Sequence, residues 1–390
     1  MTVRAFLTDS QKMRLAPTAR QRALRAELRA YFRALRPPDG GEAPQRALLR
    51  RIGADGLLGL GWPVEYGGQG RGPDEQFVFF DEAYRAGAPV SMVTLNTVGP
   101  TLMKYGTAEQ KAFFLPRILS GELVFAIGYT EPEAGTDLAS LRTRAVRAPD
   151  GGWRVDGAKT FTSNAQQADW IWLACRTDPD APKHKGISIL LVPTDAPGFS
   201  WTPIETVGGL TTTATYYDDV RLPPGALVGE ENSGWSLIAN QLNHERVALA
   251  ALGMQAEDHY HAVLAHVRET GLIGEPWVRA RLAEAHARLA ATRLLNWRLV
   301  QDVGAGTLTP GDASGVKVAG TESTVAVHAL CQEVLGEAGT VRAGSPGAFA
   351  DGEVERMNRA AQINTFGGGV SEVQREIVAT MRLGMVRRRR

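Results

Sequence analysis

The stretch Tyr129-Thr-Glu-Pro-Glu-Ala-Gly-Thr-Asp137 marks the point where the character of the chain changes. Helical patterns precede it, and short β-like runs follow it. Pro132 fixes one backbone φ angle, and Gly135 allows the backbone to approach a flat ligand closely. The hydroxyls of Thr130 and Thr136 can bond to the polar edge of a ring. Taken alone, the stretch is also compatible with an ordinary surface loop.

A second cluster, Gly157-Ala-Lys-Thr-Phe-Thr-Ser-Asn164, follows within the β-like region. It places Phe161 two residues before Ser163, and in a strand these two side chains would share a face. An aromatic ring beside a hydroxyl group suits the face and the edge of an isoalloxazine ring. The two clusters together therefore favour a flavin-binding site over a plain surface loop.

Residues 121–234 are expected to form a central β domain. Turn signals recur at short intervals between apolar runs of strand length, which is typical of a β-sandwich or barrel. A Pro-Asp-Gly-Gly turn separates the first two runs, so these are expected to pair as a hairpin. The expected strands cover residues 144–146, 153–156, 168–175, 186–192, 201–207 and 214–220.

Helical periodicity lies on both sides of the β domain. Residues 1–120 are expected to form an N-terminal helical domain, and residues 235–390 a C-terminal four-helix bundle. Alternating βαβ units are absent, so a Rossmann sheet is not expected and the fold class is α+β with three domains. The expected helices cover residues 16–35, 45–60, 74–86, 108–119, 235–252, 256–270, 276–303, 311–336 and 354–383.

Composition narrows the functional class. The 390 residues carry 43 basic and 42 acidic side chains, so the formal net charge of +1 gives no reason to expect nucleic acid as a partner. The two cysteines, Cys175 and Cys331, form no paired motif, and a disulfide framework is not expected. No apolar stretch has the length of a signal peptide or a membrane span. We expect a soluble, cytoplasmic protein without a metal site.

Six motifs in order along the chain resemble the acyl-CoA dehydrogenase family, and the resemblance covers nearly the whole chain. The resemblance implies FAD bound between the β domain and the bundle and across a subunit interface. It also implies a homodimer or homotetramer, and an electron-transfer flavoprotein or similar acceptor as partner. The motifs occupy residues 61–68, 129–137, 159–164, 217–234, 243–246 and 367–375.

The resemblance also implies roles for individual residues. Phe161 would face the flavin ring, and Ser163 would approach N5, the hydride acceptor. Arg268 is the remnant of a motif with which a neighbouring subunit grips the FAD pyrophosphate. Further flavin contacts would come from Ile127, Tyr129, Thr130, Gly135 and Thr136, and substrate contacts from Thr136, Asn243 and Arg246.

The implied reaction is α,β-dehydrogenation of an acyl-CoA or acyl carrier protein thioester, which needs a carboxylate base. Most family members carry this base before the last helix, where Gly368 stands in this chain. Some members carry it on the first bundle helix, directly before an arginine, and Glu245-Arg246 stands at that place. Glu245 is therefore the expected catalytic base. The alternatives are a helix-surface carboxylate paired with arginine, and His244 as the base.

Two other functions stay open at this stage. Glu333 stands where the family has a glutamine near the FAD pyrophosphate, and a carboxylate there would repel the pyrophosphate. This departure fits a non-catalytic partner subunit of a hetero-oligomer. A flavin-dependent hydroxylase on the same fold is a third possibility, because such an enzyme would not need Glu245.

Overall fold

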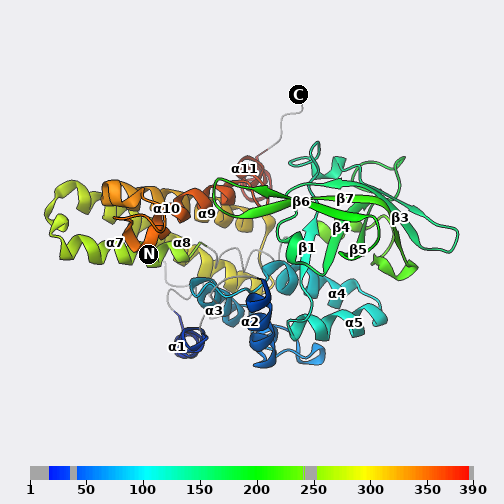
Figure 1. Ribbon diagram of the computed structural model, residues 1–390, viewed down its shortest axis with the longest axis horizontal. Helices are drawn as coiled ribbons and strands as arrows, with labels where there is room; N and C mark the ends of the chain where they lie inside the picture. The colour runs from blue at the N-terminus through cyan, green and yellow to red at the C-terminus, as the bar shows by residue number, and fades with distance from the viewer. Residues whose placement is uncertain (1–16, 36–41, 240, 242–252, 386–390) are drawn as a thin grey trace, which may run out of the picture.

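The computed structural model of the chain describes residues 17–35, 42–239, 241 and 253–385. Within these residues, N-terminal helices are followed by a β region and then by an elongated helical bundle (Figure 1). None of the described helices combines the length and the apolar character that crossing a bilayer requires. The expected order of helical, β and helical regions is confirmed.

The N-terminal helices begin at capping residues that the sequence provides. The Thr18 hydroxyl accepts from the Gln21 amide N–H, and the Gln21 side chain accepts from the Thr18 N–H, which forms a capping box. Thr107 and Gln110 repeat this arrangement at the start of a later helix. The helices are α1 (Ala19–Ala34), α2 (Glu42–Ala54), α3 (Pro73–Arg85), α4 (Gly99–Tyr105) and α5 (Ala108–Leu119), and a π-turn (Val93–Val98) precedes α4.

An ionic seam joins α1 to α3. Asp81 and Glu82 on α3 are almost completely buried, and both carboxylates accept from the Arg25 guanidinium on α1, at 2.5 and 2.6 Å. Arg85 also donates to Asp81, and Arg29 donates to Glu82. Because buried carboxylates are costly without such donors, the seam fixes how α1 lies on α3.

We expect Arg25→Met to lower the free energy of unfolding by about 1–3 kcal/mol, because two buried carboxylates each lose a donor. Denaturant unfolding followed by circular dichroism measures this change. Arg51→Met is the matched control, because Arg51 pairs with Asp55 at the exposed surface and should change stability little. Equal destabilisation by both variants would contradict the assignment of the seam.

The β region forms one connected sheet of eight strands in the described part of the chain, ordered β6-β7-β3-β2-β4-β5-β8, with β1 added parallel to β4. Long antiparallel pairings join β3 to β7, β6 to β7 and β4 to β5, whereas β2 meets β4 at a single parallel position. The strands are β1 (Phe125–Gly128), β2 (Arg144–Arg147), β3 (Trp153–Lys159), β4 (Trp170–Arg176), β5 (Ile187–Pro193), β6 (Phe199–Glu205), β7 (Thr211–Leu222) and β8 (Leu227–Val228).

The two faces of this sheet serve different cores. Trp153, Leu173, Leu190 and Val220 come from four different strands and meet in one buried cluster, so the sheet curls around its own core. The other face packs on the N-terminal helices and forms a second buried cluster with them. Trp297 from the bundle belongs to this second cluster. The expected hairpin of β2 and β3 is present, with Arg147 opposite Trp153.

The bundle extends away from the sheet (Figure 1). Its expected last helix, residues 354–383, is wrong as a single element. The chain leaves the helix in a short turn (Gln362–Thr365), and Gly368 and Gly369 then take φ angles of +66° and +102°, outside the helical region. The bundle helices are α7 (Gln255–Glu269), α8 (Pro276–Gly304), α9 (Pro310–Leu335), α10 (Glu353–Ala361) and α11 (Ser371–Ile377).

Two expected helices do not match described elements in full. The helix expected at 45–60 is shorter and earlier, because α2 ends at Ala54 and Gly56 turns the chain with a φ of +74°. The helix expected at 235–252 falls mostly on residues 240 and 242–252, which lie outside the described residues. The remaining expected helices and strands agree with the structure to within a few residues.

Candidate active site

A cavity of about 400 Å³ lies where the three domains meet, and we call it the junction cavity. Ser163 and Asn164 contribute from the β domain, and Met92 and Val93 from the N-terminal domain. The bundle closes the rest of the wall with α8, α9 and the segment 363–368. Its lining is mostly apolar with a few polar groups, which is typical of a site for a small organic ligand.

Glycines form one wall of the junction cavity. Gly367 and Gly368 line it directly, so no side chain at these positions occupies the space. The Lys317 ammonium on α9 donates to the carbonyl oxygens of Gly369 at 2.7 Å and Thr365 at 3.4 Å. Burial lowers the pKa of Lys317, and the nearby Glu322 and Glu372 counteract this in part. Lys317 therefore holds the glycine segment in its turned conformation.

A buried ion pair holds the loop 129–137. The Glu131 carboxylate accepts from the backbone N–H groups of Arg142 and Thr143, at 2.6 and 2.8 Å, and from the Lys159 ammonium at 2.8 Å. Lys159 also donates to the carbonyl oxygen of Tyr129 at 3.0 Å. Burial opposes ionisation of Glu131, but Lys159 and the two amides outweigh it, so the pKa of Glu131 is lowered.

Phe161 and Ser163 do not lie in a strand as expected. β3 ends at Lys159, and Phe161 and Asn164 adopt φ angles of +56° and +64°. Two hydrogen bonds force this turn, because Thr160 N–H donates to the loop at 2.8 Å and Thr162 N–H donates to β7 at 2.9 Å. The turn leaves Phe161 62% exposed, which is unusual for an aromatic residue.

The exposed groups fit the isoalloxazine half of FAD. Thr136 and Gly135 are exposed on the loop, and a Cβ on Gly135 would meet only the Thr130 methyl group, at 3.7 Å. The loop backbone is therefore open to a flat ring. Ser163 is exposed beside Phe161, and its hydroxyl lies 3.1 Å from the Thr212 hydroxyl. An exposed aromatic face and exposed hydroxyls are thus available on the loop 129–137 and on the turn that contributes Ser163 to the junction cavity.

The side chains of Tyr129 and Ile127 contact other parts of the protein, namely the bundle and the core shared with the N-terminal helices. The Tyr129 hydroxyl donates to the Gln241 side chain at the start of the bundle and accepts from the Trp172 indole N–H at 3.1 Å. Ile127 is half-buried in β1 and packs on the core shared with the N-terminal helices. A flavin contact through either side chain stays a prediction, whereas the link from Tyr129 to the bundle was not foreseen.

Arg268 lies apart from these groups. It is exposed in the last turn of α7, which occupies the end of the bundle remote from the sheet (Figure 1). One chain therefore does not bring Arg268 to the loop 129–137, and contact across a subunit interface stays a prediction. Glu333 accepts from the Arg281 guanidinium at 2.9 Å, so its charge is compensated within the chain.

Asn243, His244, Glu245 and Arg246 lie outside the described residues, and their roles stay predictions. Most cavity residues were not identified from the sequence, and Ser91 and Lys317 are two polar examples. Ser91 precedes the π-turn, and Lys317 lies within an otherwise ordinary helical pattern. Neither lies in a motif with a chemical signature, so only the three-dimensional packing identifies them.

Gly320 offers a test of the junction cavity. It lines the cavity from the middle of α9, and an added Cβ would meet only the Thr292 methyl group, at 3.7 Å. We expect Gly320→Ala to raise the free energy of unfolding by about 0.5–1 kcal/mol through helix propensity. It should also weaken binding of a bulky acyl group by about tenfold.

Gly315→Ala is the control for this prediction, because a Cβ on Gly315 faces Val378 at 3.8 Å and not the cavity. This variant should be stabilised without loss of affinity. Calorimetric binding and denaturant unfolding measure the two effects. An unchanged affinity of Gly320→Ala for the bulky ligand would show that the ligand does not occupy this cavity.

Comparisons with known proteins identify the family. Models of the N-terminal, middle and C-terminal acyl-CoA dehydrogenase domains match residues 18–122, 126–220 and 232–383. The acyl-CoA dehydrogenase FadE26 of Mycobacterium tuberculosis is 49% identical over 409 residues, covering 97% of this chain and 100% of the relative. FadE29 of the same organism is 48% identical, covering 95% of this chain and 98% of the relative.

Solved structures are also similar to this chain over nearly its whole length. The structure described as "Tcur3481-Tcur3483 steroid ACAD" has a TM-score of 0.93 and 56% identity, and the match covers 96% of this chain and 100% of the other. The ChsE4-ChsE5 complex from Mycobacterium tuberculosis has a TM-score of 0.90 and 50% identity, with coverage of 96% and 100%. The chain therefore belongs to the acyl-CoA dehydrogenase family, whose members are FAD-dependent flavoproteins that oxidise acyl-CoA thioesters.

Proposed function

We propose that this acyl-CoA dehydrogenase uses Glu245 as its catalytic base and acts on a bulky, steroid-like acyl group. The observation that carries the proposal is the wall of the junction cavity. Gly368 stands where most members of the family carry the base, and no side chain at this position fills the cavity that Ser163 also lines. A base is still required, and Glu245 precedes an arginine at the alternative position in the family.

The residues of this chain have separate roles in flavin binding and in proton transfer. FAD, when bound, supplies the acceptor for the β-hydride. The loop 129–137 and Phe161 provide the surface on which its ring rests, and the Glu131–Lys159 pair holds that loop. Glu245 removes the α-proton, which the thioester carbonyl makes acidic. A carboxylate does this efficiently in a dry site, where burial raises its pKa toward neutrality.

The size of the cavity supports a bulky substrate. At about 400 Å³, it is bordered by Gly253, Gly320, Gly367 and Gly368, none of which fills space with a side chain. A relative of 56% identity is described as a steroid acyl-CoA dehydrogenase. A fused-ring acyl group would use this width, whereas a straight chain would leave much of it filled only with water.

An unlike partner subunit is part of this proposal. Two similar structures carry double designations, Tcur3481-Tcur3483 and ChsE4-ChsE5, and the latter is described as a complex. In this chain the Glu333 carboxylate has only acceptor oxygens, so this position supplies no donor to an FAD pyrophosphate. A second kind of subunit would supply the missing donors. An electron-transfer flavoprotein or similar protein would reoxidise the flavin.

The deciding experiment is anaerobic flavin bleaching against a panel of acyl-CoA thioesters, with the chain purified alone and together with candidate partner subunits. We expect the visible flavin absorbance to fall fastest with a steroid side-chain acyl-CoA. A preference for short straight chains would refute the bulky substrate. Full FAD content and activity of the chain alone would refute the need for an unlike partner.

A further inference from the structure

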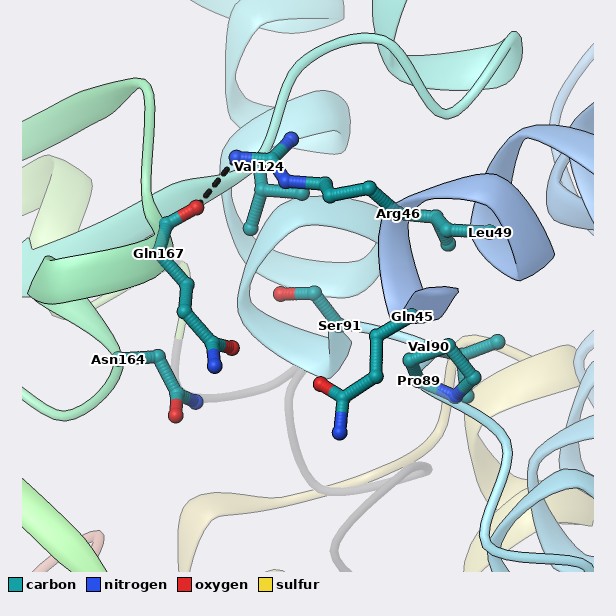
Figure 2. Close-up of a pocket in the computed structure, with 9 residues that line it drawn as sticks. All are labelled: Gln45, Arg46, Leu49, Pro89, Val90, Ser91, Val124, Asn164 and Gln167. Atoms are coloured by element: carbon teal, nitrogen blue, oxygen red, sulfur yellow. Dashed lines mark hydrogen bonds between the residues drawn. The ribbon is translucent and has the colours of Figure 1, made fainter. Parts of the chain in front are cut away.

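Side-chain hydrogen bonds join the β domain to both of its neighbours. On one side, the Arg46 guanidinium on α2 donates to the Gln167 carbonyl oxygen, a bond that Figure 2 shows as a dashed line. On the other side, the Trp172 indole N–H donates to the Tyr129 hydroxyl at 3.1 Å, and this hydroxyl donates to the side-chain oxygen of Gln241 in the bundle. We call the second connection the Tyr129 link. It begins in the core of the sheet, because Trp172 is buried and β4 is paired on both sides.

The direction of these bonds decides which end of the Gln241 carboxamide is free. An indole N–H can only donate, so the Tyr129 hydroxyl accepts from Trp172 and donates its own proton to the Gln241 oxygen. The two N–H donors on the amide nitrogen of Gln241 are then left over. Gln241 is only 2% exposed, and no described residue provides a partner for this buried nitrogen. Because a buried donor without an acceptor costs about 1–3 kcal/mol, an acceptor atom is expected beside it.

The sequence after Gln241 offers such an acceptor. Residues 234–239 and 241 are helical, and the side chains of Leu237, Ile238 and Gln241 are all buried. On a helix that continues at the same pitch, Glu245 follows Gln241 by four residues and Ile238 by seven, and such positions share a face. Glu245 itself lies outside the described residues. An ionised glutamate has only acceptor oxygens, which complement the two free donors of the amide.

We propose that Gln241 is a positioning residue for the catalytic base, and that the Tyr129 hydroxyl orients its carboxamide for this role. The amide nitrogen donates to the Glu245 carboxylate and restricts the directions in which that carboxylate can point. This inference rests on the proposed function, because it assumes that Glu245 is the base. A donor of this kind stabilises the ionised carboxylate and lowers its pKa, which opposes the rise that burial causes. The base then stays ionised, and able to accept the α-proton, at neutral pH.

Tyr129 connects the two halves of the site. Its carbonyl oxygen accepts from the Lys159 ammonium at 3.0 Å, which anchors the start of the loop 129–137, and its hydroxyl reaches the bundle through Gln241. The loop is the proposed support of the flavin ring, and Gln241 is the proposed support of the base. One side chain therefore fixes how these two supports lie relative to each other, and proton and hydride removal both depend on that geometry.

The test compares the pKa of the Glu245 carboxyl in wild type and in Gln241→Leu. Infrared difference spectra over a pH series, with the Glu245→Gln spectra subtracted, report this carboxyl without turnover. Stopped-flow flavin reduction over the same series gives a second midpoint. Gln241→Leu removes the donor, so both midpoints should rise by about one pH unit. Gln69→Leu removes an exposed glutamine that bonds to the Gly56 carbonyl oxygen, and it should leave both midpoints unchanged.

Tyr129→Phe tests the link itself. It keeps the ring but releases the Gln241 oxygen, so both midpoints should rise by less than in Gln241→Leu. In the double variant Tyr129→Phe/Gln241→Leu the rise should equal that of Gln241→Leu alone, because the hydroxyl acts through the amide. A rise equal to the sum of the two would show that Tyr129 acts separately. Tyr66→Phe is the control, because the Tyr66 hydroxyl has only a 3.4 Å bond to the Met103 carbonyl oxygen.

The outcomes separate the two proposals. If Glu245→Gln reduces its flavin at the wild-type rate, the base of the proposed function is wrong. If Glu245→Gln is slow but the carboxyl midpoint of Gln241→Leu equals that of wild type, the amide does not support the base. The same result follows if the amide donates to His244, three residues on, because the carboxyl band then stays unchanged. Should Gln241→Leu fold poorly, an unchanged carboxyl midpoint in Tyr129→Phe overturns the inference on its own.

Discussion

Glu245→Gln leaves the protein able to bind FAD but slows reduction of the flavin by acyl-CoA by about 10²–10⁴-fold, if Glu245 is the base as proposed. The amide keeps the size of the side chain but cannot accept the α-proton. Stopped-flow absorbance at the flavin band measures the rate directly. Binding of the 2-enoyl product should stay nearly unchanged, which separates loss of proton transfer from loss of affinity.

Two control variants make this result specific. Glu269→Gln changes an exposed carboxylate in the last turn of α7 and should reduce the flavin at the wild-type rate. His244→Gln tests the rival base, and it should retain most of the activity. A Glu245→Gln variant that reduces its flavin at the wild-type rate would instead place the base elsewhere. An inactive His244→Gln with an active Glu245→Gln would assign proton transfer to the histidine.

Lys159→Met is expected to lower the free energy of unfolding by about 3–5 kcal/mol, because it leaves the Glu131 carboxylate buried without its cation. The loop 129–137 also loses the bond from Lys159 to the Tyr129 carbonyl oxygen. FAD should therefore bind more weakly, even though no flavin contact is assigned to the lysine. Denaturant unfolding and the FAD content after gel filtration measure the two effects.

The double variant Glu131→Gln/Lys159→Met tests the mechanism of this loss, because it removes both charges and should recover part of the stability. Lys183→Met breaks an exposed pair with Asp137 in the same loop and should change the free energy of unfolding little.

A lowered pKa for Glu131 means that the stability contributed by this carboxylate is present above the ordinary value of 4.5 and is lost as the pH falls below it. The stability of Glu131→Gln should therefore fall less than that of wild type as the pH is lowered below this value. An equal fall in both proteins would contradict the assignment.

The arrangement of domains could be predicted from sequence because it depends on local signals. Helix α5 has both its cap, Thr107, and a regular apolar face, so its expected bounds agree with the structure. The strands β4 and β5 are continuous apolar runs bounded by turn residues, and both were recognised. Errors arose where backbone conformation changes inside a regular pattern, as at Gly368, where an apparent helix is interrupted.

The candidate site was predictable only in part, for a different reason. The loop 129–137 carries its chemistry in consecutive residues, so its motif is visible in the sequence. The junction cavity instead joins Ser91, Ser163, Lys317 and Gly368 from segments far apart in the chain. Nothing local brings them together. The turn at Phe161 also escaped prediction, because bonds from Thr160 and Thr162 to other segments impose it.

The left-handed backbone of the glycine segment has an evolutionary consequence. At Gly368 the φ angle of +66° costs any residue with a Cβ about 1–2 kcal/mol, so a glutamate at this position would start from a strained conformation. A single Gly368→Glu replacement would therefore carry this cost before it could serve as a proton acceptor. The loop would first have to abandon the shape that the Lys317 ammonium imposes on it.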